Sequence, residues 1–427
     1  MSDATPADAV DPSDPADLAA RPAHADASPL YGPRFQTEPA ELYREMRGRH
    51  GAVAPILLDD DVPAWLVLGY REVHYVASNP NLYARDPRRW NAWHRIPPDW
   101  PLRTLLGYQP SVLFAEGTEH QRRSGAVSDA LTAADQFEVR ANCERVADEL
   151  IDAFAGRGEA DLVADYADRI PLPVLAKIVG LPESEIMDVV RDMNLSVYGG
   201  AEALEAFERN HGRVGRLVSL RREVPGTDAA SRLIVHPAGL TDTEIVEDLV
   251  VVMGGGQLPT ACWIGNTLRL MLTDDRFALT LSGGRRSIGQ ALNEVLWADT
   301  PTQNMAGRFA VRDTQLGGHH IRAGDLLILG LAAANHDPRV RPDSYADSGG
   351  NQAHMSFSHG EHRCPHAAQE LAEVIAETAI EVLLDRLPDV TLAVAGDALV
   401  WRPSPWMRGL TALPVQFTPT YMAGSVL

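Results

Sequence analysis

A cysteine near the end of the chain stands in a setting that suits metal binding. The residues Phe-Ser-His-Gly-Glu-His-Arg-Cys occupy positions 357–364, and a proline follows them. Apolar residues then recur three and four apart, at Leu371, Val374 and Ile375, which is typical of a helix. A cysteine just before a helix faces backbone N–H groups and the positive end of the helix dipole, and both favour the thiolate. The pattern therefore predicts a metal-ligating thiolate at Cys364.

The rest of this loop suits a flat ligand that carries acidic groups. Gly360 lets the chain turn tightly against a planar group, because glycine has no Cβ. Phe357 can cover the sulfur and keep water out, while His362 and Arg363 can donate to carboxylates. The alternative interpretation is that Cys364 is only a small buried residue at the start of a helix.

The loop resembles the signature of the cytochrome P450 family, which is Phe-x-x-Gly-x-His/Arg-x-Cys. One position differs, because the family usually has glycine two residues after the cysteine and this chain has His366. Residues 119–123, 316–338 and 401–415 resemble other family segments in the same order. The resemblance covers residues 30–417 and implies the P450 fold, which is mainly α with small β-sheets.

The resemblance also implies a cofactor, haem b, with Cys364 as the ligand of its iron. A thiolate ligand favours cleavage of the O–O bond. Arg308 and His120 match family positions that contact the haem propionates. The predicted cofactor-binding residues are therefore Cys364, Phe357, Gly360, His362, Arg308 and His120.

One family element departs from its usual pattern. The family has Glu-x-x-Arg in a helix where this chain has Glu294-Val-Leu-Trp297. Residues three apart share a helix face, so the usual pair is a salt bridge. Residues 342–347 have no arginine in the place where the family continues this network, so we expect Glu294 to lack its usual partners. It then takes another donor, such as the Trp297 indole or Arg339, or it binds a proton. The chain resembles a bacterial subfamily with tryptophan in this position.

A second departure lies in the long helix that crosses the haem in this family. Residues 255–260 are Gly-Gly-Gln-Leu-Pro-Thr, where the family has Ala/Gly-Gly-x-Asp/Glu-Thr. Leu258 thus replaces the acid, and Pro259 replaces the alcohol, of a pair that relays protons. Proline also removes one helix hydrogen bond. We therefore expect the helix to open here, with Pro259 near the haem.

Water held in this opening is the expected proton source, with the nearest polar side chains helping to hold it. The predicted catalytic residues are Thr260, Gln257, Pro259 and Gly256. The alternative is that a polar group of the substrate completes the relay.

Three tryptophans, Trp90, Trp93 and Trp100, lie where the family places a loop over its substrate. They either line an aromatic pocket or anchor this loop to the core, and the sequence leaves both open.

The elements around these residues follow from periodicity. Residues 53–58 and 64–68 predict a β-hairpin, and residues 116–281 predict mainly helices. Residues 308–311 and 326–329 predict further strands. Residues 1–29, rich in Ala, Asp and Pro, predict a disordered acidic tail, and residues 30–427 predict a single P450 catalytic domain.

Composition limits the partners. The 427 residues carry a formal net charge of −20, which opposes binding to nucleic acid or to an anionic membrane surface. The three cysteines are an odd number at wide spacing, which does not indicate a disulfide framework and fits a reduced cytoplasm. The sequence has no pattern of a signal peptide and no apolar run long enough to span a bilayer.

The resemblance implies a cytochrome P450 monooxygenase or oxidase that tailors a natural product. Ferredoxin and ferredoxin reductase are the expected electron donors, and a small molecule or a peptide is the expected substrate. Two reactions remain open: hydroxylation of a small apolar molecule, and oxidative coupling of aromatic rings. The alternative is a haem-binding sensor or partner protein without turnover, because two parts of the usual machinery are altered.

Overall fold

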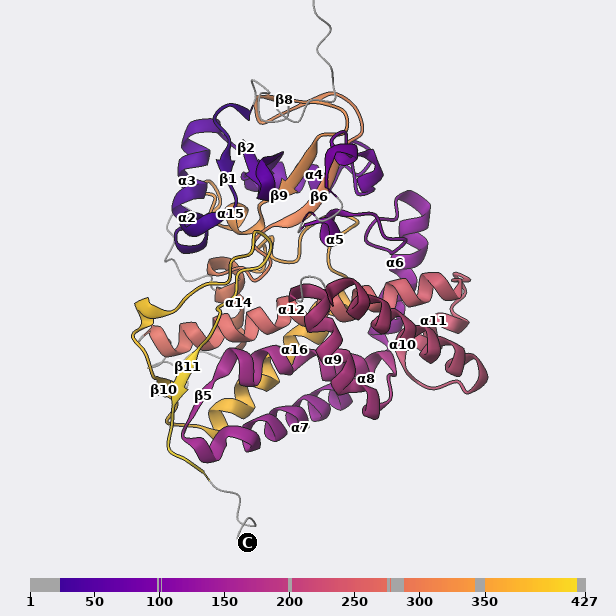
Figure 1. Ribbon diagram of the computed structural model, residues 1–427, viewed down its shortest axis with the longest axis vertical. Helices are drawn as coiled ribbons and strands as arrows, with labels where there is room; N and C mark the ends of the chain where they lie inside the picture. The colour runs from indigo at the N-terminus through magenta and orange to yellow at the C-terminus, as the bar shows by residue number, and fades with distance from the viewer. Residues whose placement is uncertain are drawn as a thin grey trace, which may run out of the picture.

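The computed structural model describes residues 24–97, 100, 102–198, 202–274, 277, 288–341 and 350–420. Helices dominate one half, and a mixed sheet with short helices forms the other (Figure 1). The predicted fold class, mainly α with small β-sheets, is confirmed. None of the described helices combines the length and the apolar character that a membrane span requires.

The largest sheet has six strands in the order β1-β2-β3-β9-β6-β4. Their bounds are Ser28–Pro29 for β1, Val53–Leu58 for β2, Val62–Val67 for β3, Tyr83–Ala84 for β4, Met305–Ala310 for β6 and Leu326–Leu329 for β9. The predicted hairpin is confirmed, since β2 and β3 pair antiparallel from Val53 opposite Val67 to Leu58 opposite Val62. Both strands are almost wholly buried, which explains their continuous apolar runs.

The predicted tail, residues 1–29, lies mostly outside the described residues. Its end does not fit the prediction, because Ser28 and Pro29 pair in parallel with Ile56 and Leu57. The sheet therefore begins before the predicted domain boundary at residue 30.

Short helices lie beside this sheet (Figure 1). They are α2 (Gly32–Thr37), α3 (Pro39–His50), α4 (Tyr70–Ala77), α5 (Arg103–Leu106) and α15 (Leu331–Asn335). Two smaller sheets complete the strands: β10 (Thr391–Leu392), β11 (Pro414–Gln416) and β5 (Glu159–Asp161) form one, and β7 (Thr314–Leu316) and β8 (His319–Ile321) form the other.

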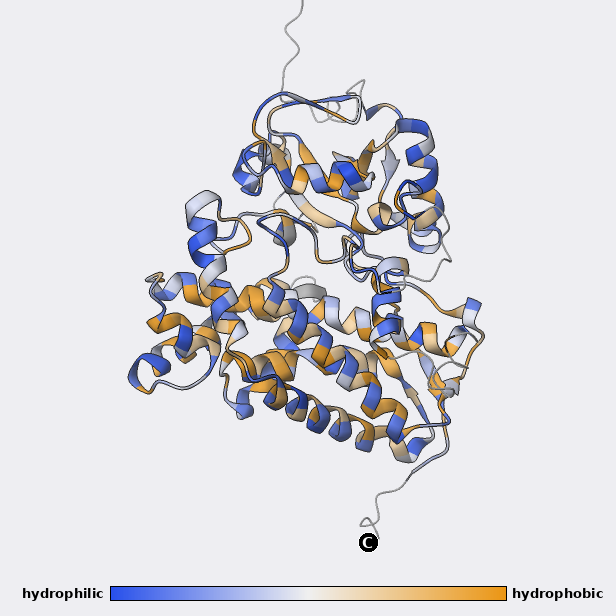
Figure 2. Cartoon of the chain, turned by 180° about the vertical axis from the view of Figure 1, so that it is seen from behind, coloured by the Kyte–Doolittle hydropathy of each residue, from blue (hydrophilic) through white to orange (hydrophobic). Residues whose placement is uncertain are grey.

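The helical half is built around α12 and α16, with hydrophobic residues concentrated on the inner helices (Figure 2). Its helices are α6 (Gly117–Thr132), α7 (Gln136–Phe154), α8 (Pro171–Val179), α9 (Glu183–Tyr198), α10 (Ala203–Glu223), α11 (Ala229–Val235), α12 (Asp242–Thr273), α14 (Ile288–Ala298) and α16 (His366–Arg386). A capping box starts α12, because the Thr241 hydroxyl accepts from the Glu244 N–H and the Glu244 carboxylate accepts from the Thr241 N–H.

The three tryptophans anchor their loop to the core. The Trp90 ring lies 5.7 Å from that of Trp93 and 6.0 Å from that of Trp100, measured between centroids. Trp90 also contacts Phe309 of β6, and the Trp100 indole donates to the Asp59 carbonyl over 3.0 Å. Trp90 and Trp100 are buried among apolar side chains of the sheet, so the structure favours the anchoring interpretation.

Candidate active site

The loop before α16 is held in one shape by its own backbone. The Cys364 N–H donates to the Phe357 carbonyl over 3.0 Å, and the Ser358 N–H donates to the Met355 carbonyl over 2.7 Å. The Gln369 amide, one turn into α16, donates to the Cys364 carbonyl over 2.6 Å. These contacts fix the backbone of the loop around Cys364 at the start of α16.

Gly360 packs closely against a neighbouring helix. Its φ is +75°, and a Cβ there would lie 2.1 Å from the Ala77 carbonyl oxygen at the end of α4. The positive φ agrees with the expected tight turn, and the expectation that this turn faces a flat group remains a prediction. The tight turn lets the loop pack directly on the α4 backbone.

The charge state of Cys364 depends on the burial of its thiol as well as on the helix dipole. The side chain is half-buried, and this burial raises the pKa of the thiol to about 12. The loop alone therefore does not hold a thiolate at neutral pH, and a bound cation such as a metal ion is needed to stabilise it.

Three of the predicted cofactor-binding residues come together although they are far apart in sequence. His120 of α6, Arg308 of β6 and His362 of the loop are all buried, and the two imidazole centroids are 3.9 Å apart. In the described part of the chain, His120 Nδ1, Arg308 Nη2 and His362 Nε2 make no hydrogen bond, although Glu361 Oε1 lies 3.4 Å from His362 Nε2. Buried donors without partners are costly, so this cluster is built for a ligand that accepts hydrogen bonds.

A second buried guanidinium group, that of Arg85, lies beside this cluster and was not predicted. Its guanidinium donates to the carbonyls of Leu113 and Gly307, each over 2.9 Å, and to that of Ala306. Arg85 therefore ties the segment before α6 to β6. Nothing in the local sequence marks it, because all three carbonyls belong to distant segments.

The electrostatics of the cluster call for negative charge. Burial, and next the charge of Arg85, hold the pKa of Arg308 well below its usual value. Burial lowers the pKa of His120 to about 4, with further lowering by Arg85 and Arg308. Two buried guanidinium groups thus face two neutral imidazoles, and carboxylate groups would relieve this excess of positive charge.

A metal ion would fit this cluster poorly, although ligand atoms are present. His120, Glu361 and His362 offer atoms within 4.8 Å of one another. The charges of Arg85 and Arg308 act on both histidines and would repel a divalent cation. The cluster would instead suit an anionic group, such as the propionates of a haem.

Comparison with known proteins agrees with this geometry. No model of a known protein family matches the chain. The chain superposes on CYP154C4 from Streptomyces sp. W2061 with a TM-score of 0.81 and 25% identity, covering 91% of this chain and 97% of that one. The match to CxnD, a cytochrome P450 for C–S bond formation in chuangxinmycin biosynthesis, has a TM-score of 0.79 and 27% identity, covering 93% and 99%. This is the cytochrome P450 fold.

Relatives in sequence carry related names. The chain is 29% identical to mycinamicin IV hydroxylase/epoxidase of Micromonospora griseorubida, over 90% of this chain and 94% of the relative. It is 28% identical to the cytochrome P450 monooxygenase PikC of Streptomyces venezuelae, over 92% and 94%. The chain is accordingly an enzyme of the cytochrome P450 monooxygenase class, and haem is the cofactor that this class implies.

The Glu-x-x-Trp element of this P450 has an arginine after all. Arg341 Nη2 lies 2.8 Å from Glu294 Oε1, and both side chains are largely buried. Glu294 therefore takes another donor, as one of the expected alternatives had it, but this donor is Arg341 and neither of the two suggested residues. Arg339, one suggested partner, instead binds Asp337 and Glu72. The sequence pattern did not indicate Arg341, because this residue stands just before residues 342–347, where the family pattern places its arginine.

Trp297 anchors the segment that leads to the loop of residues 357–364, called the thiol loop below. Its indole N–H donates to the Asn351 carbonyl over 2.8 Å, and the Asn293 amide donates to the same oxygen over 3.2 Å. The ring also lies 5.8 Å from the Arg341 guanidinium carbon. The tryptophan thus supplies a hydrogen bond and apolar volume where the family has a cation.

The P450 helix α12 runs without a break from Asp242 to Thr273, with Pro259 inside it. The expected opening of the helix is therefore wrong. Gly256 packs closely against α8, because a Cβ there would lie 2.7 Å from Leu175 Cδ1 and would require that side chain to shift. Pro259 still lacks an N–H, so the Gly255 carbonyl is without its usual helix donor.

The predicted catalytic residues divide between two faces of α12. Gln257 and Thr260 are buried, and the Gln257 amide donates to the Asp168 carbonyl over 2.7 Å. Gly255, Leu258 and Pro259 are more exposed and share the other face of the helix. The two polar candidates for the proton relay therefore point away from the face on which the family carries its acid and alcohol.

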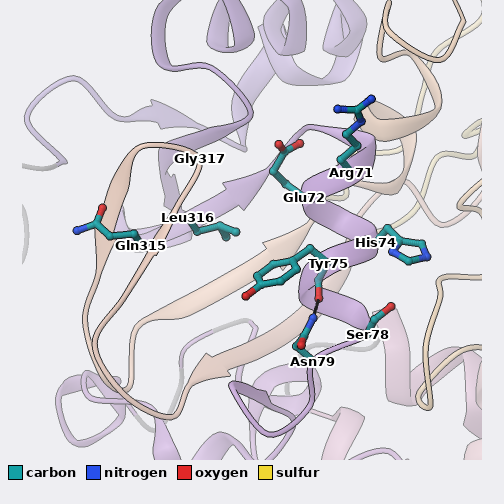
Figure 3. Close-up of a pocket in the computed structure, with 9 residues that line it drawn as sticks. All are labelled: Arg71, Glu72, His74, Tyr75, Ser78, Asn79, Gln315, Leu316 and Gly317. Atoms are coloured by element: carbon teal, nitrogen blue, oxygen red, sulfur yellow. Dashed lines mark hydrogen bonds between the residues drawn. The ribbon is translucent and has the colours of Figure 1, made fainter.

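An open hollow in the surface lies outside this site, between α4 and the loop that joins β7 to β8 (Figure 3). It is lined by Arg71, Glu72, His74, Tyr75, Ser78, Asn79, Gln315, Leu316 and Gly317. His74 turns away from Tyr75 in this view, and its ring lies 4.0 Å from that of His359 in the thiol loop. The hollow therefore borders the outer side of the loop and contains none of the predicted site residues.

Proposed function

We propose that this P450 binds haem b through Cys364 and tailors a natural product in the cytoplasm, using O2 and electrons from ferredoxin and ferredoxin reductase. One observation carries the proposal: His120, Arg308 and His362 present buried nitrogens that make no hydrogen bond, close to the cysteine loop. The names of relatives support the pathway class, since one is a polyketide biosynthesis cytochrome P450 of Bacillus subtilis. The Glu-x-x-Trp subfamily is part of this proposal.

The side chains have separate tasks in this proposal. Cys364 Sγ would ligate the iron, and the three unpartnered groups would donate to the propionates. Arg85 adds positive charge and holds the walls of the cluster together. Haem, when bound, supplies the activation of oxygen. Phe357 would shield the sulfur from water, since its ring packs against Trp263 in the apolar core.

The exposed face of α12 favours an apolar substrate. Val251, Val252, Gly255, Leu258 and Pro259 share this face and carry no polar side chain. An acid does occur two turns earlier, but the Asp248 carboxylate is buried and held by Arg123 over 2.5 Å. A proton must then come from water held at the Gly255 carbonyl or from the substrate itself.

This lack of a relay bears on the choice of reaction. Insertion of oxygen depends on controlled proton delivery, whereas coupling of aromatic rings does not end in oxygen insertion. We propose coupling of aromatic rings, in a peptide or a small molecule, as the reaction that this face suits better. Hydroxylation remains open for a substrate that brings its own hydroxyl group. Proton delivery through Thr260 and Gln257 is the competing proposal, and the position of both side chains on the buried face of α12 disfavours it.

Two measurements test the proposal. The ferrous carbonyl complex should show the red-shifted Soret band of thiolate haems, and Cys364→Ala should abolish it. Aromatic peptides and small apolar molecules should then be screened for a shift of the haem spectrum and for NADPH-dependent product with a ferredoxin system. A band that survives Cys364→Ala would contradict the ligation.

A haem-binding protein without turnover is the second candidate. Leu258 and Pro259 favour it, because they remove both members of the usual proton relay. NADPH consumption coupled to a product would exclude this candidate. Haem binding with no product across the library and with several ferredoxins would support it.

A further inference from the structure

Four rings, two of them buried indoles and two half-buried, form a row between the thiol loop and the surface near residue 351. Trp263 of α12 lies 5.9 Å from Phe357, Phe357 lies 5.7 Å from His354, and His354 lies 5.9 Å from Trp297 of α14, between ring centroids. Trp263 and Trp297 are 4% and 2% exposed. Two indoles are thus joined by an unbroken row of ring contacts.

One part of this row meets the cysteine. The Phe357 carbonyl accepts from the Cys364 N–H over 3.0 Å, so one hydrogen bond connects the row to the metal-binding residue. The other end lies just beneath the surface. Trp297 donates to the carbonyl of Asn351, whose side chain is exposed.

The surroundings of the row suit a transient positive charge on an indole. His354 lies between Phe357 and Trp297, and burial lowers its pKa to about 4, so its ring is neutral at physiological pH. The positive charge of Arg341 beside Trp297 is offset by Glu294 at 2.8 Å. Neither neighbour of Trp297 therefore adds an uncompensated positive charge.

We propose that Trp263 and Trp297 form an electron-transfer path that reduces the site at Cys364 when oxygen has been activated but no substrate is oxidised. The inference rests on the proposed function, which supplies the oxidant. Trp263 gives one electron to the oxidised site and becomes an indole radical cation. Trp297 then gives one electron to Trp263, and an external thiol reduces Trp297 by one electron, losing a proton as it becomes a thiyl radical.

This path gives Trp297 a role that the arginine of other P450s lacks. Indole can be oxidised by one electron, whereas guanidinium cannot be oxidised under these conditions. Phe357 and His354 are not oxidised in this scheme, and they serve as bridges between the two indoles. The exchange of cation for tryptophan thus adds a redox-active group close to the surface.

The test uses the haem-loaded enzyme mixed with hydrogen peroxide in the absence of substrate. Samples are frozen at early times for electron paramagnetic resonance, and later samples are digested to locate oxidised tryptophans by mass spectrometry. The wild type should give an indole radical and oxidation at Trp297. Trp297→Phe should lower the radical yield by more than half, and Trp263→Phe should remove oxidation at Trp297.

Two further variants separate electron transfer from packing. Trp297→Tyr restores a redox-active ring and should give a tyrosyl signal, which a purely structural role would not produce. Trp100→Phe, in the aromatic cluster of the sheet, is the matched control and should keep the wild-type yield. Melting temperature and the carbonyl spectrum show that each variant is folded and loaded.

The outcomes are distinguishable. Wild-type radical yield and wild-type oxidation sites in both Trp297→Phe and Trp263→Phe would overturn the path while leaving the proposed function intact. A wild-type protein without the thiolate band would refute the proposed function, and the path with it. A tyrosyl signal in Trp297→Tyr together with loss of signal in Trp297→Phe would support the path.

Discussion

The thiol loop and the exposed face of α12 are built by opposite means. The segment that leads into the loop is fixed by polar contacts: the Met355 N–H donates to the Asn335 side chain over 2.7 Å, and the Ser356 hydroxyl donates to the Leu296 carbonyl over 2.6 Å. The α12 face at Gly255 and Pro259 has only backbone and apolar groups to offer. The thiol loop thus holds the predicted metal ligand in one position. The exposed face of α12 supplies no proton donor of its own, so protons must come from water or from the substrate.

This difference indicates that holding the cofactor and delivering protons are separable tasks. The contacts of the thiol loop involve α14, α15 and α16, so they constrain the fold as well as the site. The acid and alcohol of the haem helix have no such structural duty, and apolar residues can replace them without loss of the helix. We therefore expect substitutions in the loop to have larger effects than substitutions on the helix.

The largest expected effect is the loss of the cysteine ligand. Cys364→Ala should remove the red-shifted carbonyl band completely, because no other residue of the loop supplies a thiolate. Cys143→Ala is the control: this cysteine is buried in the helical core and should keep the band. An intact band in Cys364→Ala would show that the thiol loop does not supply the metal ligand, and its contrast with the exposed face of α12 would no longer hold.

Gly360→Ala tests how closely the loop is packed. Its φ of +75° and the contact of a new Cβ with the Ala77 carbonyl should together cost about 3 kcal/mol of unfolding free energy. Gly350 has a φ of +83° but open space around it, so Gly350→Ala should cost only about 1 kcal/mol. Chemical denaturation of both variants measures the difference. Equal losses would show that backbone strain alone, and not the contact with α4, fixes the loop.

The Glu294–Arg341 pair should contribute less than the glycine contact but more than a surface pair. Arg341→Leu should lower stability by about 2 kcal/mol, since it leaves a largely buried carboxylate without its partner. Arg44→Ala, which breaks an exposed pair with Glu41, should cost less than about 1 kcal/mol.

The same network predicts the result of restoring the family motif. Trp297→Arg should not stabilise the protein, because it places a second cation beside Arg341 and removes the hydrogen bond to Asn351. A higher melting temperature in this variant would contradict the role of tryptophan as an anchor.

The smallest effects are expected for the polar residues of α12. Thr260→Ala and Gln257→Ala should leave peroxide release within about twofold of wild type, because both side chains lie on the buried face. Gln257→Ala should cost about 1 kcal/mol of stability through its lost bond to the Asp168 carbonyl. Peroxide assays with a bound substrate decide this point. A large rise in peroxide release would restore the protein-based relay.

Sequence patterns predicted those parts of the fold and the site whose residues lie close together in the chain. The motif at residues 357–364 and the hydrophobic runs of β2 and β3 are short-range signals, and both led to the observed elements. Arg85 and Arg341 were missed because their partners are distant in the chain, at residues 306–307 and at Glu294. A single proline also did not break α12. The helix packs in the core both before and after Pro259, and this packing keeps it continuous.

The contact between Gly360 and the end of α4 has a mechanical consequence. Because no side-chain atom fits between the two backbones, the thiol loop and α4 behave as one stiff piece. His74 and His359 extend this contact outward, with their rings 4.0 Å apart. A displacement of α4 would therefore also move Cys364 Sγ. The position of this sulfur thus depends on a helix from the N-terminal part of the chain.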